Sequence, residues 1–153
     1  MYLFAYGSLM NPRSLAKTLP GERITRRAVL KGYQRKMNFT YEGYAYLNIV
    51  PNPDASVSGV LIELTLEELA LFSSREEGYV ATAVGKYIDG ALGDVVAFIA
   101  PDIECSFKVP RSYLNTCTAG MTVSDRETWL KETVMGEIEE DAEAPLYIFA
   151  SQE

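Results

Sequence analysis

Residues 2–15, YLFAYGSLMNPRSL, form the stretch that decides the fold. Residues 2–6 are apolar and aromatic, which predicts a short buried strand that ends at Gly7. Asn11 followed by Pro12 is typical of a helix N-cap with proline at the first helical position. The stretch therefore predicts a strand, a tight loop and a capped helix in direct succession.

Downstream of this stretch, alternating apolar residues predict further strands, and capping signals predict further helices. Strands are expected at 24–33, 35–39, 45–50, 57–64, 79–88, 94–100 and 146–150, with a turn at 51–54 (PNPD). Helices are expected after a Thr65–Glu68 capping box, from Pro110, and after a Ser124–Glu127 capping box, the last carrying Trp129, Leu130, Val134 and Ile138. Gly59, inside the clearest strand, allows a bulge or a close backbone approach.

Strands dominate the first two thirds of the sequence, and helices gather late. This order predicts an α+β fold, with a small mixed or antiparallel, barrel-like sheet and flanking helices. Because no linker or repeat is visible, residues 1–153 are expected to form a single domain.

The composition of the chain narrows the range of possible partners and catalytic groups. The net charge of −7 argues against nucleic acid or an anionic membrane as the main partner. Neither a signal peptide nor an apolar run of eighteen residues is visible, and Cys105 and Cys117 have no disulfide or metal spacing, so a cytoplasmic protein is expected. The chain has no histidine, which excludes Ser–His and Cys–His pairs and argues against catalytic zinc. Acid–base chemistry would then fall to a carboxylate, tyrosine, lysine or cysteine, and no metal or cofactor is expected.

The loop at residues 6–9 (YGSL) is the first candidate site. Gly7 lets the backbone turn sharply, so that consecutive N–H groups can face one point and hold a carboxylate or phosphate. Ser8 adds a hydroxyl group. The alternative is an ordinary turn between a strand and a helix.

The second candidate is residues 73–79, SSREEGY, between an expected helix and strand. Adjacent carboxylates point in different directions, so only one of Glu76 and Glu77 is expected to face inward. A partly desolvated carboxylate has a raised pKa and can act as base and then acid. The alternative is a solvated helix end in which Arg75 pairs with a glutamate.

Four segments, in order along nearly the whole chain, resemble the gamma-glutamylcyclotransferase-like superfamily, which includes the plant avirulence-induced proteins. They are FAYGSLMNPRSL (4–15), NIVPNPDASVSGVLIELTLEEL (48–69), FSSREEGYVATAV (72–84) and VPRSYLNTCTAG (109–120). The resemblance implies a barrel-like sheet with a cavity at one end, where loop amides hold the α-carboxylate of a gamma-glutamyl group. It also implies that one glutamate moves a proton while the substrate amine closes a ring to 5-oxoproline and releases an amine, amino acid or peptide.

Carried over to this sequence, the resemblance gives a base and a set of ligand contacts. An alignment on R-E, a spacer and G-Y assigns the base to Glu76, whereas an alignment on E-G assigns it to Glu77; Glu76 is preferred. The implied substrate contacts are Tyr6, Gly7, Ser8, Leu9, Tyr79 and Tyr113.

Two other functions stay open at this stage. The chain could be a small-ligand-binding or regulatory protein that keeps the fold and the cavity without turnover. It could also be an interaction module that uses the acidic residues 137–143. The leaving group and the oligomeric state are not set by the sequence.

Overall fold

The computed structural model of the protein describes residues 1–72 and 75–140. Its elements, in chain order, are β1 (Tyr2–Ala5), η1 (Ser8–Met10), α1 (Pro12–Ala16), β2 (Thr25–Tyr41), β3 (Tyr44–Glu63), α2 (Leu66–Ala70), β4 (Val80–Ala83), η2 (Gly85–Tyr87), β5 (Val95–Ile99), β6 (Val109–Pro110), α3 (Arg111–Thr118), α4 (Val123–Lys131), β7 (Thr133–Val134) and β8 (Ile138–Glu139). The strand expected at 146–150 lies outside the described residues.

Six strands form the main sheet, in the order β4-β5-β1-β3-β2-β7, and β6 pairs with β8 separately. The pairs β1–β3, β2–β3 and β4–β5 are antiparallel, whereas β1–β5 and β2–β7 are parallel. The predicted α+β class is confirmed. Within the described residues the ladder does not close into a ring, since β4 and β7 form its edges.

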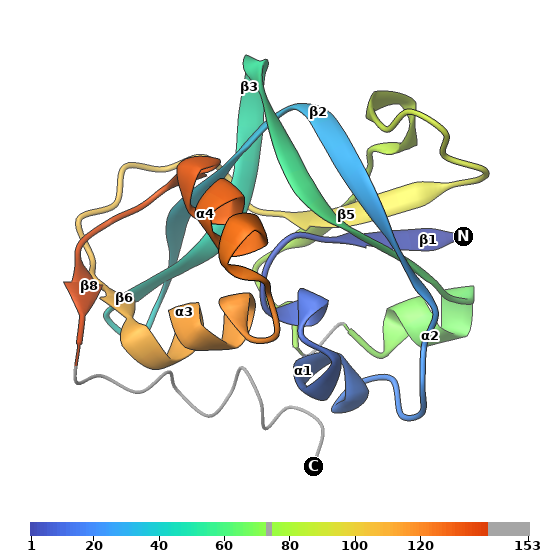
Figure 1. Cartoon of the computed structure of the whole chain (residues 1–153), viewed down its shortest axis with the longest axis horizontal. Helices are drawn as coiled ribbons and strands as arrows, with labels where there is room; N and C mark the ends of the chain where they lie inside the picture. Colours follow the sequence, from blue (N-terminus) through green and yellow to red (C-terminus); the bar gives the residue numbers. More distant parts are fainter. Residues whose placement is uncertain (73–74, 141–153) are drawn as a thin grey trace.

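The longest elements are β2 and β3, which run together as a twisted ribbon (Figure 1). They are joined by a tight turn in which Glu42 and Gly43 both have positive φ, 47° and 85°, as hairpin turns require. The separate strands expected at 24–33 and 35–39 are one strand, and so are those at 45–50 and 57–64. The prediction of a turn at 51–54 is also wrong. The chain stays extended there, and its turn residues form a bulge in which 52–55 stand opposite Gly32 alone.

Three of the helix starts follow their sequence signals. The side chain of Asn11 accepts a hydrogen bond from Arg13 N and caps α1. Thr65 and Glu68 make the predicted capping box on α2, and α3 begins directly after Pro110.

The start and the length of α4 were predicted wrongly. Thr122, not Ser124, is the N-cap, because its side chain accepts from the backbone N–H of Asp125. The helix ends at Lys131, so Val134 lies in β7 and Ile138 in β8. The glycine at position 136, a poor helix former, stands between these two strands.

β1 is covered on both faces, as its central place in the sheet requires. Phe4 belongs to a large cluster that includes Tyr6 and Trp129, whereas Leu3 and Ala5 belong to a second cluster. Successive side chains of a strand point to opposite faces, so the apolar residues of β1 pack alternately into two hydrophobic clusters.

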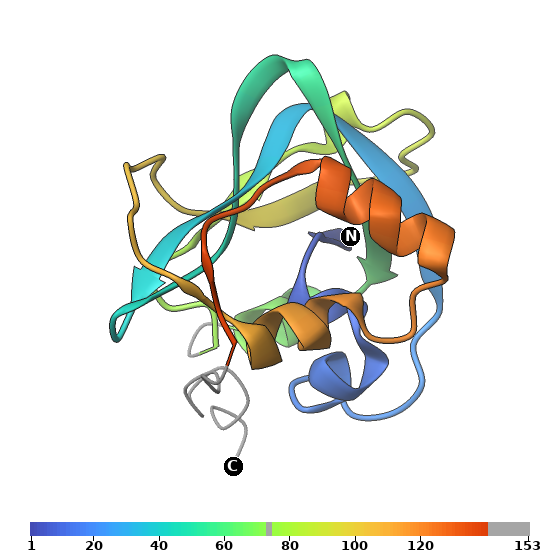
Figure 2. The same cartoon turned by 60° about the vertical axis from the view of Figure 1, so that its left-hand side comes forward.

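The end of β1 is the place where helices converge. In both views α1 and α3 lie side by side next to this end (Figures 1 and 2). Asn11, which caps α1, also donates from Nδ2 to the carbonyl of Thr116 in α3, at 3.1 Å. One asparagine therefore joins the loop after β1 to a helix from the far end of the sequence.

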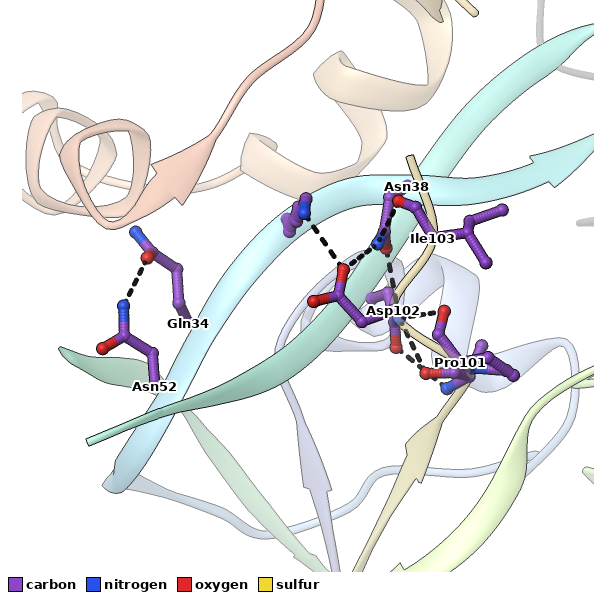
Figure 3. Close-up of polar contacts among 9 residues, drawn as sticks. Gln34, Asn38, Asn52, Pro101, Asp102 and Ile103 are labelled. Carbon is purple, nitrogen blue, oxygen red and sulfur yellow. Dashed lines mark hydrogen bonds and ion pairs between the residues drawn. The ribbon is translucent and has the colours of Figure 1, made fainter. Parts of the chain in front are cut away.

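Asparagine side chains fix the segment that follows β5 against the β2–β3 ribbon (Figure 3). Fully buried Asn48 donates to Ala100 O and to Asn38 Oδ1, at 2.9 and 3.1 Å, and accepts from Ala100 N. Asn38 donates in turn to Asp102 Oδ1 at 2.9 Å. These bonds hold β3 rigidly beside Leu47, which lines the candidate site.

Candidate active site

The loop after β1 is a compact turn. Gly7 has φ −143° and ψ −126°, and its carbonyl accepts from Met10 N at 3.0 Å, which closes η1. Among the described residues, the N–H groups of Gly7, Ser8 and Leu9 have no hydrogen-bond acceptor. Three consecutive backbone donors of this loop are thus without a protein partner in the described part of the chain, as an anion-binding loop requires.

Close packing explains why position 7 is a glycine. A Cβ added there would lie 2.7 Å from Leu47 Cδ1 and 3.7 Å from the Tyr113 hydroxyl. Contacts below 3.0 Å force a neighbour to move. The missing side chain therefore lets the backbone of the loop face Leu47 and Tyr113 directly.

One pocket brings together the loop and the second candidate segment. It is lined by Leu3, Phe4, Ala5, Tyr6, Gly7, Ser8, Leu9, Leu47, Glu76, Tyr79, Phe98 and Tyr113. This lining includes every substrate contact that the resemblance implies, and it includes Glu76, the preferred base. The apolar members from β1, β3 and β5 were not singled out in the sequence, because each is indistinguishable locally from an ordinary core residue.

Glu76 is held in the turn that precedes β4. Its N–H donates to Phe72 O at 2.8 Å, and its carbonyl accepts from Tyr79 N at 3.0 Å. The side chain is only 15% exposed. Burial raises the pKa of the carboxyl group from 4.5 to about 7, against the opposing effect of Arg75. A carboxyl group with such a pKa can both take and return a proton near neutral pH.

Arg75 anchors this turn under the loop and does not lie in a solvated helix end. It is 4% exposed, and it donates to Ser14 O at 2.6 Å and to the hydroxyl of Ser8 at 3.5 Å. Its Nε lies 3.7 Å from Glu76 Oε1. The guanidinium group therefore connects the loop to the carboxylate, and it limits the rise of the Glu76 pKa.

Glu77 differs from Glu76 in its surroundings. Its side chain is exposed, and it is absent from the pocket lining. Gly78 follows with φ +91°, a conformation that turns the chain between Glu77 and Tyr79. The turn thus directs one carboxylate to the pocket and the next to solvent.

The three tyrosines line the pocket with their rings, and their hydroxyl groups contact the protein backbone. Tyr6 donates to Phe98 O and Tyr79 donates to Leu47 O, both at 2.5 Å. The hydroxyl of Tyr113 accepts from Leu47 N at 3.4 Å. In this arrangement the tyrosines shape the walls, Tyr6 contacts β5, and Tyr79 and Tyr113 contact β3, while the unpaired backbone donors belong to the loop.

The sequence model of the family described as gamma-glutamyl cyclotransferase, AIG2-like, matches residues 3–113. The chain belongs to this family. The matched residues include the loop, Glu76 and Tyr113, which line the pocket of this family member. A comparison with curated protein sequences finds no match.

Solved structures share the fold of this family member. YkqA from Bacillus subtilis superposes with a TM-score of 0.71 at 22% identity, over 86% of this chain and 53% of YkqA. The chain thus spans about half the length of that protein. An uncharacterized protein from Homo sapiens gives a TM-score of 0.72 at 16% identity, over 96% of this chain and 94% of its own. A solved structure named gamma-glutamyl cyclotransferase gives a TM-score of 0.69 at 15% sequence identity, over 96% of this chain and 94% of its own. At these identities the likeness shows the fold alone.

The described residues were also compared with the requirements of a metal site and of a membrane-spanning helix. In residues 1–72 and 75–140, no group of three or more His, Cys, Asp or Glu side chains is placed to hold a metal ion. No helix in the described part of the chain is long and apolar enough to cross a membrane.

Proposed function

We propose that the protein is an enzyme that cyclises a gamma-glutamyl group to 5-oxoproline and releases an amine, an amino acid or a peptide. The observation that supports this most strongly is the pairing, in one pocket, of three free loop N–H groups with a buried carboxyl group whose pKa is about 7. Family membership supports the same reaction.

The loop would hold the substrate through its α-carboxylate. The N–H groups of Gly7, Ser8 and Leu9 are donors without acceptors in the described structure, and Arg75 lies behind Ser8. Backbone donors bind a carboxylate without the cost of ordering long side chains. Binding at this end leaves the α-amine and the γ-carbonyl of the substrate facing the rest of the pocket.

Glu76 would then act as base and acid in turn. As a carboxylate it takes a proton from the α-ammonium group, and the freed amine attacks the γ-carbonyl carbon. The new C–N bond closes a five-membered ring, and protonated Glu76 gives its proton to the leaving nitrogen as the bond between that nitrogen and the γ-carbon breaks. The ring nitrogen then loses its second proton, so that 5-oxoproline carries one N–H and the amine leaves as an ammonium ion. Because attack is intramolecular, positioning and one proton shuttle supply most of the required catalysis.

Release of 5-oxoproline from a panel of substrates tests the proposal. We expect turnover with at least one of glutathione, gamma-glutamyl amino acids and gamma-glutamyl amines, and none with the matched α-glutamyl dipeptides, in which the amine cannot reach a γ-carbonyl group in an amide bond. If the folded protein releases no 5-oxoproline from any gamma-glutamyl compound, the enzyme proposal fails. The small-ligand-binding alternative would then be the better account.

The pH dependence follows from the pKa of Glu76, about 7. The base must be ionised to accept the proton, and its ionised fraction falls tenfold for each pH unit below its pKa. We therefore expect kcat/KM to rise about tenfold per pH unit between pH 5 and 6 and to level off above about pH 7. Initial rates at constant ionic strength would measure this profile. A flat profile from pH 5 to 8 would rule out Glu76 as the base.

A further inference from the structure

Two buried side chains behind the loop donate to the same carbonyl oxygen. Arg35 Nε donates to Tyr6 O at 2.8 Å, and Trp129 Nε1 donates to it at 3.3 Å. Arg35 comes from β2 and Trp129 from α4, and they are 0% and 1% exposed. The Tyr6 carbonyl is thus fixed by donors from opposite ends of the sequence.

Arg35 is itself rigidly held. Its guanidinium group lies 4.6 Å from the centre of the Trp129 ring and donates to the carbonyls of Ser58 and Trp129. Although burial lowers the pKa of Arg35 to about 10, the group stays charged at neutral pH. Within residues 1–72 and 75–140 no carboxylate makes an ion pair with it, and the nearby charge of Glu132, which accepts from Ser58, opposes the fall in the pKa of Arg35. A positive charge is therefore fixed directly behind the Tyr6–Gly7 peptide.

The geometry of a peptide bond carries this effect into the pocket. In a trans peptide the C=O and N–H groups point in opposite directions, and no cis peptide occurs among the described residues. A Tyr6 carbonyl that faces Arg35 and Trp129 turns the N–H of Gly7 away from them, and Gly7 lines the pocket. Hydrogen bonds to the carbonyl also polarise the peptide, which makes its N–H a stronger donor.

We propose that Arg35 and Trp129 are positioning residues that clamp the Tyr6 carbonyl, and so direct and strengthen the Gly7 N–H as a donor to the substrate carboxylate. This inference rests on the proposed function, because it assigns the carboxylate to the loop. The clamp contacts the loop and not the reacting atoms. It should therefore change substrate binding and leave the chemical step nearly unaltered.

Trp129→Phe tests the clamp. It removes the Nε1–H donor and part of a buried ring but keeps an aromatic ring beside Arg35, whereas replacing Arg35 would also remove its bonds to Ser58, Trp129 and Thr133. Loss of one such bond is expected to raise KM, and the dissociation constant for 5-oxoproline, about three- to tenfold, with kcat within twofold. A purely structural defect would lower the amount of active enzyme, and hence kcat, at unchanged KM.

Thr122→Ala is the matched control. It removes the N-cap of α4, the helix that carries Trp129, without touching a donor to Tyr6. Both variants weaken the attachment of α4, but only Trp129→Phe should shift the Gly7 amide proton resonance in the ligand-free protein and raise KM.

Three results would overturn the inference in distinguishable ways. If the Gly7 resonance does not move in Trp129→Phe, the clamp does not exist, whatever the substrate is. Equal affinity of wild type and Trp129→Phe for 5-oxoproline would remove its role in carboxylate binding while cyclisation stands. If the wild-type protein neither binds 5-oxoproline nor releases it from any substrate, the proposed function fails, and the role of the clamp in carboxylate binding fails with it. The Gly7 resonance would still decide whether the clamp exists.

Discussion

Glu76→Gln should lower the rate of 5-oxoproline release about a thousandfold, whereas Glu77→Gln should stay within about twofold of wild type. Glutamine keeps the size of the side chain in the pocket but has no basic oxygen that can accept a proton. Glu77 is exposed and lies outside the pocket lining, so it serves as the adjacent, chemically identical control. Steady-state rates of both variants on one gamma-glutamyl substrate would measure the difference.

The stability of Glu76→Gln provides an independent check that a loss of rate is chemical. The pKa of Glu76 rises from 4.5 to about 7 on folding, so the folded protein favours the protonated form. Stability from this preference is complete below about pH 4.5 and is lost as the pH rises through about 7. At pH 8 the variant avoids burying a charge, and it should exceed wild type by up to about 3 kcal/mol in free energy of unfolding.

Two outcomes would contradict this assignment. Full activity in Glu76→Gln together with loss in Glu77→Gln would move the base to the second glutamate, as the E-G alignment allows. A variant that is inactive and also less stable than wild type at pH 8 would show that Glu76 supports the fold and not the proton transfer. Urea denaturation at pH 5 and pH 8 separates these cases.

Gly59→Ala should cost about 3 kcal/mol or more of unfolding free energy. Gly59 lies in β3 where that strand passes β1, and an added Cβ would overlap the carbonyl oxygen of Ala5 and come within 2.7 Å of Phe4 Cζ. The first of these atoms is backbone in the central strand of the sheet, so it has no rotamer into which to move. A large fall in the urea midpoint, or failure to fold, is expected.

Gly93→Ala is the control for this substitution. Gly93 is exposed, and the nearest atom to an added Cβ is Tyr2 Cε2, at an ordinary 3.8 Å. Its free energy of unfolding should stay within about 0.5 kcal/mol of wild type. A loss below 1 kcal/mol in Gly59→Ala would mean that β1 and β3 separate more easily than their packing implies.

The parts of the site that the sequence predicts are those with a local signal. The loop at 6–9 follows from a glycine between a strand and a capped helix, and the close approach at Gly59 follows from a glycine inside a strand. The REEG turn marks two candidate carboxylates but does not separate them. Their exposure depends on how residues 75–78 turn against the rest of the molecule, which is a tertiary property.

Other features have no local signal. Arg35 and Trp129 meet at Tyr6 only because β2 and α4 pack against the end of β1, and nothing in their neighbouring residues marks them. The strong turn signal of 51–54 was overridden because the long pairing of β2 with β3 continues past it as a bulge. The capping box predicted from Ser124 was misplaced, because the hydroxyl of Thr122, two residues earlier, accepts from Asp125 N and caps α4.

The place of β1 in the middle of the sheet also affects how the chain is made. Tyr2 pairs with Glu63 on one side and with Val95 on the other, so β1 is synthesised roughly sixty residues before its first partner in the sheet. The β2–β3 hairpin needs only neighbouring sequence and can form during that interval. The ribbon can therefore form before β1 joins it, and until then the apolar side chains of β1 would be shielded only by transient contacts or by a chaperone.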